Sequence, residues 1–192
     1  RIEPENNIHM ILDAFSRAPE KKLVIVGLWN HGPYGMELRA KYSNYPNIHL
    51  LDPIYDQDQL NEIRSNAAVY VHGHSAGGTN PSLVEAMCLG LPIISYGVSY
   101  NRETTNHRAC YFNNETELLE QLNRLTPTEQ QRMGAEMEQY GRRYYTWKRI
   151  TSLYAAAFTG QDPSYRELLN EMADRQVEQI ELNIPQQTAD IA

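Results

Sequence analysis

The residues best suited to binding a ligand lie in one short loop that reads Gly-Gly-Thr-Asn and is followed by a proline. Asn80 is a typical helix N-cap, and Pro81 suits the first helical position, where its missing N–H costs nothing. The free backbone N–H groups of Gly77, Gly78 and Thr79 would then form a concave donor surface at the positive end of the helix. The sequence therefore predicts a site for phosphate or sugar oxygens at this loop.

Glu85 is the one charged residue in the helix that follows, among residues 83–89, which are otherwise apolar on every side. We expect that helix to be buried, and a buried carboxylate is costly unless it accepts hydrogen bonds. Side chains lean towards a helix N-terminus, so Glu85 should point back at the glycine-rich loop and accept from two neighbouring hydroxyls of a ligand. The alternative is a capping box formed with Ser82.

Two histidines, His72 and His74, end the apolar run that leads into the loop. Their position at the mouth of the expected site favours a ligand role for His74. The alternative for both is a structural histidine that is hydrogen-bonded within the fold. His31 and Trp29, in the loop after an earlier apolar run, are weaker candidates, and Trp29 would either flank a base or pack internally.

Alternating apolar runs and amphipathic stretches must position these residues. We predict strands over 22–27, 48–51, 68–72, 92–96 and 109–112, and helices over 8–17, 34–42, 58–65, 81–89 and 115–125. This alternation with short connections is typical of the α/β class, with a doubly wound, Rossmann-like parallel sheet flanked by helices. We expect the run at 22–27 to be buried on both faces. Ligands bind outside the carboxyl ends of such strands, which is where the glycine-rich loop falls.

We expect two parts in the chain: a Rossmann-like domain over 1–160, and an acidic amphipathic helix with a disordered tail over 161–192. Beyond residue 127 the pattern is helical, and its aromatic residues are expected to pack against the sheet edge. No strand precedes the first helix, whereas such units normally begin with one. The first strand of the domain is therefore expected upstream of Arg1.

Composition limits the function classes. The chain has 192 residues, 41% apolar residues and a net charge of −7, and no apolar run approaches the roughly 18 residues that a membrane span needs. The acidic balance disfavours a nucleic-acid partner. Cys88 and Cys110 have no metal-ligand spacing, so we expect no metal site, no disulfide framework and a cytoplasmic location. Attachment at the inner face of a membrane is left open.

Three segments carry a resemblance to a known family. Glu85-Ala-Met followed by Gly90-Leu-Pro, the opening Arg1-Ile-Glu-Pro-Glu-Asn-Asn, and Tyr100-Asn-Arg-Glu are similar to the donor-site motifs of family 4 glycosyltransferases of the GT-B fold. The amino-acid sequence of these motifs is most similar to that of a bacterial rhamnosyltransferase-like branch of surface-polysaccharide biosynthesis. The resemblance covers about residues 1–160.

The resemblance implies that the chain is the donor-binding half of a GT-B hexosyltransferase. Glu85 would hold the ribose hydroxyls of a nucleotide diphosphate sugar, and Arg1 would pair with the diphosphate, which suits a guanidinium. The backbone of the loop would contact the sugar or the diphosphate, and Arg102 and Glu103 would lie near the nucleotide. The alternative for Arg102 and Glu103 is a surface ion pair.

The same resemblance implies a metal-independent, retaining transfer to a saccharide or lipid-linked saccharide acceptor, with no cofactor besides the donor substrate. The acceptor site would lie on an N-terminal domain outside this chain, so we expect this chain to bind nucleotide but to transfer nothing by itself.

Two positions depart from the family pattern: Gly77 stands where many members carry a glutamate, and Asn6 where they carry a lysine beside the diphosphate. Losing the lysine removes a charge that would offset the leaving group. A non-catalytic nucleotide-sugar-binding module is therefore the second hypothesis. An epimerase of the same architecture is the third, since fold alone does not decide function.

Overall fold

The computed structural model describes residues 2–159, and the chain divides into two compact units, Arg1–Tyr144 and Tyr145–Ala192. Arg1 and the predicted helix over 165–180 lie outside the described residues. The predicted boundary after residue 160 falls at the edge of these residues and stays a prediction.

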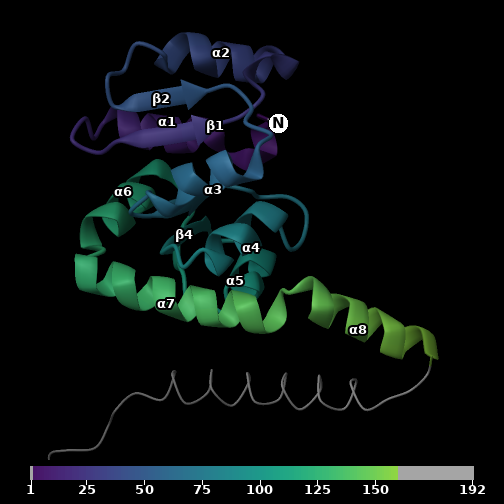
Figure 1. Cartoon of the computed structure of the whole chain (residues 1–192). Coiled ribbons are helices and arrows are strands. Elements are labelled where there is room, and N and C mark those ends of the chain that lie inside the picture. The colour runs from purple at the N-terminus through teal and green to yellow at the C-terminus, as the bar shows by residue number, and fades with distance from the viewer. Residues whose placement is uncertain (1, 160–192) are drawn as a thin grey trace, which may run out of the picture. The chain divides into compact units, whose positions relative to one another are not determined.

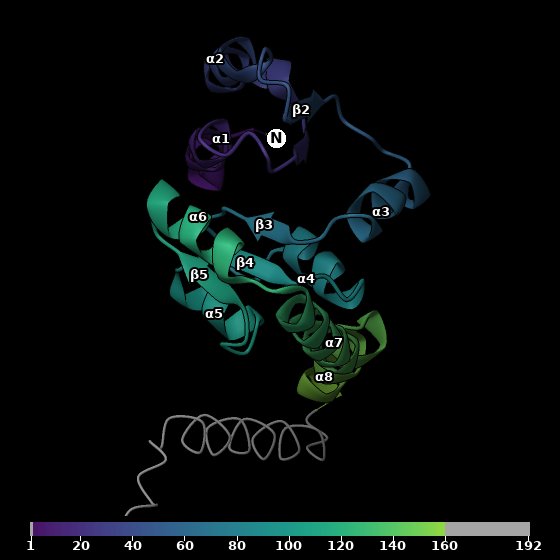
Figure 2. The ribbon, with the colours of Figure 1, turned by 90° about the vertical axis from the view of Figure 1, so that its left-hand side faces the viewer.

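The described elements of the first unit alternate between strand and helix (Figures 1 and 2). The strands are β1 (Leu23–Val26), β2 (Ile48–Leu51), β3 (Tyr70–His72), β4 (Ile93–Tyr96) and β5 (Cys110–Phe112). The helices are α1 (Ile8–Ser16), α2 (Pro33–Tyr42), α3 (Gln57–Ser65), α4 (Pro81–Cys88), α5 (Ser99–Thr104), α6 (Glu115–Arg124) and α7 (Pro127–Tyr144), with short 3-10 turns η1 (Pro4–Asn6) and η2 (Trp29–His31). The predicted strands and helices are confirmed to within two residues at each end, whereas α5 was not predicted.

All of the strand pairs are parallel, which confirms the α/β class. β1 pairs with β2, with Leu23 opposite Ile48, and the order β3-β4-β5 forms a second sheet, with Tyr70 opposite Ile93. Helices flank these sheets, and α1 also packs against α6 (Figure 2). Within the described residues, β1 and β3 therefore each have a hydrogen-bonded neighbour on one side only.

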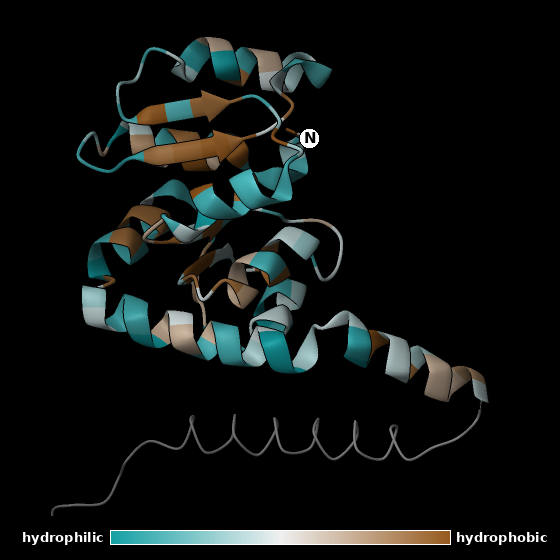
Figure 3. Ribbon diagram, viewed as in Figure 1, coloured by the Kyte–Doolittle hydropathy of each residue, from teal (hydrophilic) through white to brown (hydrophobic). Residues whose placement is uncertain are grey.

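The strands are buried to different extents: β4 is paired on both sides, whereas β1 is paired on one side among the described residues. Ile93 and Ile94 of β4, the central strand of its sheet, are fully buried. Figure 3 shows β1 and β2 as largely hydrophobic strands, but Val24 of β1 is 46% exposed. The expectation that residues 22–27 are buried on both faces is therefore wrong at Val24. The physical reason is that β1 is bordered by a strand on one side only among the described residues.

The long helix α7 packs closely on α4 because glycine residues let the backbones approach. A side chain at Gly134 would collide with the backbone carbonyl of Gly90, just after α4, and one at Gly141 would press on Cys88. Met137 of α7 is fully buried in the same interface. This contact fixes α4, and with it the loop that leads into α4.

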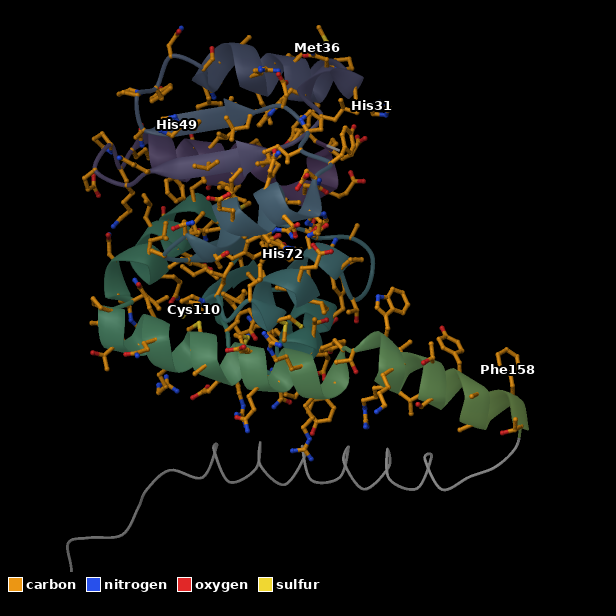
Figure 4. All side chains as sticks on the ribbon, in the orientation of Figure 1. His31, Met36, His49, His72, Cys110 and Phe158 are labelled. Atoms are coloured by element: carbon orange, nitrogen blue, oxygen red, sulfur yellow. The ribbon has the colours of Figure 1, made fainter. Side chains whose placement is uncertain are left out.

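The second unit contributes α8 (Trp147–Thr159) to the described residues. Three of its aromatic side chains are exposed, Trp147 by 81%, Tyr154 by 64% and Phe158 by 86%, and Figure 4 shows Phe158 projecting from the helix. The expectation that the late aromatic residues pack against the sheet edge concerns the placement of the second unit and stays a prediction for these three. Tyr140, in α7, is buried as expected. No helix among residues 2–159 is long and apolar enough to cross a membrane.

The α4–α7 contact gives a first prediction. Gly134→Ala should lower the free energy of unfolding by about 1–3 kcal/mol, because the added methyl group meets the Gly90 carbonyl. Helix propensity alone favours alanine over glycine by about 1 kcal/mol, so the two causes predict opposite signs. Urea unfolding measures the change, with the exposed Gln139→Ala of the same helix as a control expected to stay within about 0.5 kcal/mol. A stabilised Gly134→Ala protein would contradict the close contact.

Candidate functional site

The candidate site begins where β3 ends and α4 starts. Asn80 is the N-cap of α4, because its Oδ1 accepts from the backbone N–H of Ser82 at 2.9 Å, and Pro81 occupies the first helical turn, as the sequence predicts. The loop before it is exposed at Gly77, Gly78 and Thr79. A Cβ at Gly77 or Gly78 would meet no atom within 4 Å, so the space in front of both glycines is open.

The N-terminal segment fixes one side of this loop. Asn7, which takes a left-handed backbone conformation with φ 50°, donates from Nδ2 to the carbonyl of Gly73 at 2.9 Å. The backbone N–H of Ser75 donates to the carbonyl of Glu5 at 2.7 Å, and its hydroxyl donates to the same oxygen at 3.0 Å. Gly73 allows this approach, because a Cβ there would collide with the carbonyl of Asn6. Residues 3–7 are thereby tied to the end of β3.

The same segment also reaches the end of β1. The side chain of Ile2 is buried, and a Cβ at Gly27, directly after β1, would collide with it. The stretch from Ile2 to Asn7 therefore runs across the carboxyl ends of both β1 and β3. This is the edge of parallel sheets at which ligands bind in open α/β folds.

The short helix α5 fixes the loop from the other side. Asn101 is fully buried, and its Nδ2 donates to the carbonyl of His74 at 2.9 Å and to that of Tyr96 at 3.0 Å. The hydroxyl of Thr104 lies 3.4 Å from that of Thr79. Asn101 thus joins the ends of β3 and β4. Its Oδ1 is buried with no hydrogen-bond partner within the described part of the chain.

His72 is the last residue of β3 and His74 lies two residues beyond it, and their surroundings differ. His72 is 1% exposed, and burial lowers its pKa to about 3. Its Nε2 has no hydrogen-bond partner among residues 2–159, and the lowered pKa keeps the ring neutral. The ring of His74 stacks on that of His72, with centroids 4.6 Å apart. His74 is half-buried at the loop, and burial lowers its pKa as well.

Glu85 reaches a partner that the sequence did not suggest. Its Oε2 accepts from Nη1 of Arg64, at the end of α3, at 2.6 Å. The Glu85 side chain is 43% exposed, so the expectation of a buried carboxylate is wrong. The reason is that α4 buries Leu83, Ala86 and Met87 and leaves the Glu85 side half open. The capping-box alternative is not observed, because the N–H of Ser82 is satisfied by Asn80.

The remaining predicted residues have other partners. Nε of Arg102 donates to the carbonyl of Gly97 at 3.1 Å, and its guanidinium lies over the Tyr111 ring, 4.1 Å from the centroid. Glu103 is exposed, and its Oε1 lies 3.0 Å from Nε2 of His107. Arg102 and Glu103 therefore contact different groups and do not form an ion pair with each other. Their ligand roles stay predictions. The predicted role of Arg1 falls outside the described residues.

The two candidate ligand-binding residues in the loop after β1, Trp29 and His31, have different surroundings. Trp29 is 1% exposed and donates from Nε1 to the carbonyl of Leu51 at 2.8 Å, which supports internal packing. His31 is exposed in η2, as Figure 4 shows.

Sequence reasoning missed Asn7, Asn101 and Arg64. Asn7 and Asn101 lay inside motifs that had been singled out, but no signal in the sequence marked Arg64.

The arrangement offers two chemical features at one strand edge. Gly77, Gly78 and Thr79 are exposed just before the positive end of α4, and backbone N–H groups in such a place suit anionic or hydroxyl oxygens. Glu85, one helical turn further, offers a half-exposed carboxylate that suits hydroxyl donors. Together they can bind a polar, anionic ligand.

Comparisons with known proteins identify the family and the fold of the chain. Residues 1–144 match the family described as "Glycosyl transferases group 1". Among solved structures, Anabaena Alr3699/HepE in complex with UDP is similar with a TM-score of 0.73 at 17% identity, over 83% of this chain and 47% of that one. Sucrose-phosphate synthase from Thermosynechococcus elongatus is similar with a TM-score of 0.70 at 19% identity, over 83% and 44%.

A third neighbour is WaaG, a glycosyltransferase involved in lipopolysaccharide biosynthesis, with a TM-score of 0.58 at 18% identity over 72% of this chain and 40% of that one. The chain therefore spans less than half the length of these three solved structures. At these identities the neighbours show the fold, which is one half of the GT-B architecture.

The buried His72 makes stability depend on pH. The unfolded chain binds a proton near pH 6.5, but the folded chain does so only near pH 3. Stability is therefore unaffected above about pH 6.5 and falls by about 1.4 kcal/mol per pH unit below it. His72→Phe should remove this loss, so that between pH 7 and 4.5 it loses about 2–3 kcal/mol less than the wild type.

Urea unfolding at both pH values tests this prediction. The exposed His49, labelled with His72 in Figure 4, provides the matched control His49→Phe, which should keep the pH dependence of the wild type. Equal pH dependence in His72→Phe and wild type would show that the folded protein accommodates a charged His72.

Proposed function

The chain belongs to the glycosyl transferases group 1 family, and we propose that its first unit binds the nucleotide diphosphate sugar donor of a hexosyl transfer. The observation that carries this proposal is the open loop at Gly77–Asn80, which presents backbone N–H groups at the N-terminus of α4 and is held from both sides by buried or half-buried amide contacts. A preorganised set of donors suits a diphosphate, because the donors need no rearrangement when charge develops on the leaving group.

We assign the polar parts of the donor to separate groups. The N–H groups of Gly77, Gly78 and Thr79 would contact the sugar or the diphosphate, with Arg1 as a further diphosphate partner. The carboxylate of Glu85 would accept hydrogen bonds from the ribose hydroxyls. Two neighbouring structures are complexes with UDP and with UDP-glucose, which supports a nucleotide-sugar donor for this chain.

We further propose the finer reading of the sequence motifs, a rhamnosyltransferase-like enzyme that acts in surface-polysaccharide synthesis in the cytoplasm or at the inner membrane face. The amino-acid sequence of the motif formed by the loop and α4 supports this function. The acceptor would bind to a second domain of a longer protein, because the similar solved structures are more than twice as long as the matched part. This chain alone should then bind donor without transferring the sugar.

The β1 and β3 edges support a more specific view of that longer protein. Each strand is paired on one side only among the described residues, and the segment from Ile2 to Asn7 crosses the carboxyl ends of both. We propose that a parallel strand lies between them and joins the two sheets into one. Such a strand would cover the exposed Val24 and satisfy the free edge groups.

A second function, a non-catalytic nucleotide-sugar-binding module, is supported by a specific observation. Gly77 and Asn6 replace the glutamate and lysine expected near the diphosphate. A non-catalytic nucleotide-sugar-binding module needs neither charge. Both functions predict donor binding, and only transfer of the sugar by the full-length protein distinguishes them.

The ribose role of Glu85 gives the central prediction. Titration calorimetry with UDP-, dTDP- and GDP-sugars should identify a donor that binds to the wild-type chain. Glu85→Ala and Glu85→Gln should then weaken that donor by at least about tenfold, because hydrogen bonds to a charged group contribute about 1.5–3 kcal/mol. The exposed Glu120→Ala in α6 is the control and should leave the affinity unchanged. Unchanged affinity in both Glu85 variants would exclude the ribose role.

The open space at Gly78 gives an independent prediction about the loop. Gly78→Ala should keep the free energy of unfolding within about 0.5 kcal/mol, because the new methyl group meets no protein atom. Donor affinity should nevertheless fall, because the methyl group occupies the surface on which the ligand would lie. Gly73→Ala should do the reverse and lower stability, because its methyl group meets the Asn6 carbonyl. Full donor affinity in Gly78→Ala would place the donor elsewhere.

A further inference from the structure

The ion pair between Arg64 and Glu85 connects two helices that the sequence separates by 21 positions. Arg64 lies in the last turn of α3, and Glu85 lies in the middle of α4. The Nη1 to Oε2 distance of 2.6 Å is that of a strong charge-assisted hydrogen bond. Among the described side chains of α3, Arg64 is the one seen to hydrogen-bond to another helix.

The two partners are exposed to different extents. The side chain of Arg64 is 12% exposed, whereas that of Glu85 is 43% exposed. The guanidinium is therefore largely covered by protein, and the carboxylate keeps an open side. Oε2 is engaged by Arg64, whereas Oε1 has no hydrogen-bond partner within residues 2–159. One oxygen of the carboxylate is thus available to a ligand.

The phenol of Tyr70 lies beside this pair. Burial raises the pKa of Tyr70 to about 12, and the charges of Arg64 and Glu85 act on it in opposite directions. Tyr70 therefore stays neutral next to the pair. Because the Arg64 side chain is largely covered, its attraction to the carboxylate is screened less than in bulk water, which favours one orientation of that carboxylate.

We infer that Arg64 is a positioning residue for donor binding, which holds the Glu85 carboxylate by Oε2 so that Oε1 faces the sugar hydroxyls of the nucleotide. The inference rests on the proposed ribose role of Glu85 and adds a second residue to it. A flexible glutamate would lose side-chain entropy on binding, whereas a held one has already lost it. Arginine suits this task better than lysine, because its planar fork fixes the carboxylate plane.

The experiment compares two ligands on the same variants. The probe is the tightest binder among UDP, dTDP and GDP, together with its 2′,3′-dideoxy form, which lacks the sugar hydroxyls. The variants are Arg64→Gln, Arg64→Lys and Glu85→Gln, each measured by calorimetry. The control Arg132→Gln removes an arginine that is paired with Glu136 on the exposed face of α7.

The wild type should prefer the complete nucleotide over the dideoxy form by about tenfold. Arg64→Gln should lose most of that preference while binding the dideoxy form as the wild type does, and Arg64→Lys should keep an intermediate preference. In Arg64→Gln/Glu85→Gln, the loss should not exceed that of Glu85→Gln alone. Arg132→Gln should retain the wild-type preference.

Other results overturn the inference in distinguishable ways. If Arg64→Gln weakens both ligands equally and lowers the melting temperature, Arg64 only supports the fold. If Glu85→Gln loses the preference but Arg64→Gln keeps it, the ribose role stands and the positioning role fails. If Glu85→Gln keeps the preference too, the proposed function of Glu85 fails, and the role of Arg64 fails with it.

Discussion

The candidate site depends on how the backbone groups of residues 73–75 are satisfied after β3 ends. A buried carbonyl or N–H without a partner costs about as much as a lost hydrogen bond, so each group needs a donor or acceptor. Asn7 bonds the carbonyl of Gly73, Glu5 accepts from the N–H of Ser75, and Asn101 bonds the carbonyl of His74. Two segments distant in sequence, residues 5–7 and the helix α5, therefore converge on one turn of chain.

This constraint explains why the next residues are open. Once residues 73–75 are fixed and α4 is held against α7, the loop from Gly77 to Thr79 spans between two anchored ends. Its N–H groups belong to residues before the N-cap Asn80, so they take no part in the hydrogen bonds within α4. Exposure of these groups costs little in water, and a phosphate oxygen can replace the water. The packing that holds both ends of the loop thus also leaves the loop residues exposed to solvent.

The sequence predicted the local part of this site well and the tertiary part poorly. Asn80 and Pro81 define the start of α4 through short-range chemistry, so the loop and its helix were predictable. The six residues of α5 have no apolar periodicity, and so the helix that carries Asn101 was read as a loop. The pairing of Glu85 with Arg64 depends on how α3 and α4 face each other, which no pattern of either helix encodes. The exposure of Val24 depends on its strand neighbours in the same way.

Gly77 stands where the resemblance seen in the sequence predicts a glutamate, and its backbone conformation suits a glycine. Its φ is +108°, a region that L-residues with a Cβ rarely adopt. A glutamate at this position would either pay for that conformation, at a cost of about 1–3 kcal/mol, or move the loop. The change to glycine therefore alters the backbone path as well as removing a carboxylate. A loop built in this way would contact its ligand through N–H groups, and the half-open carboxylate of Glu85 becomes the acidic group closest in sequence to that surface.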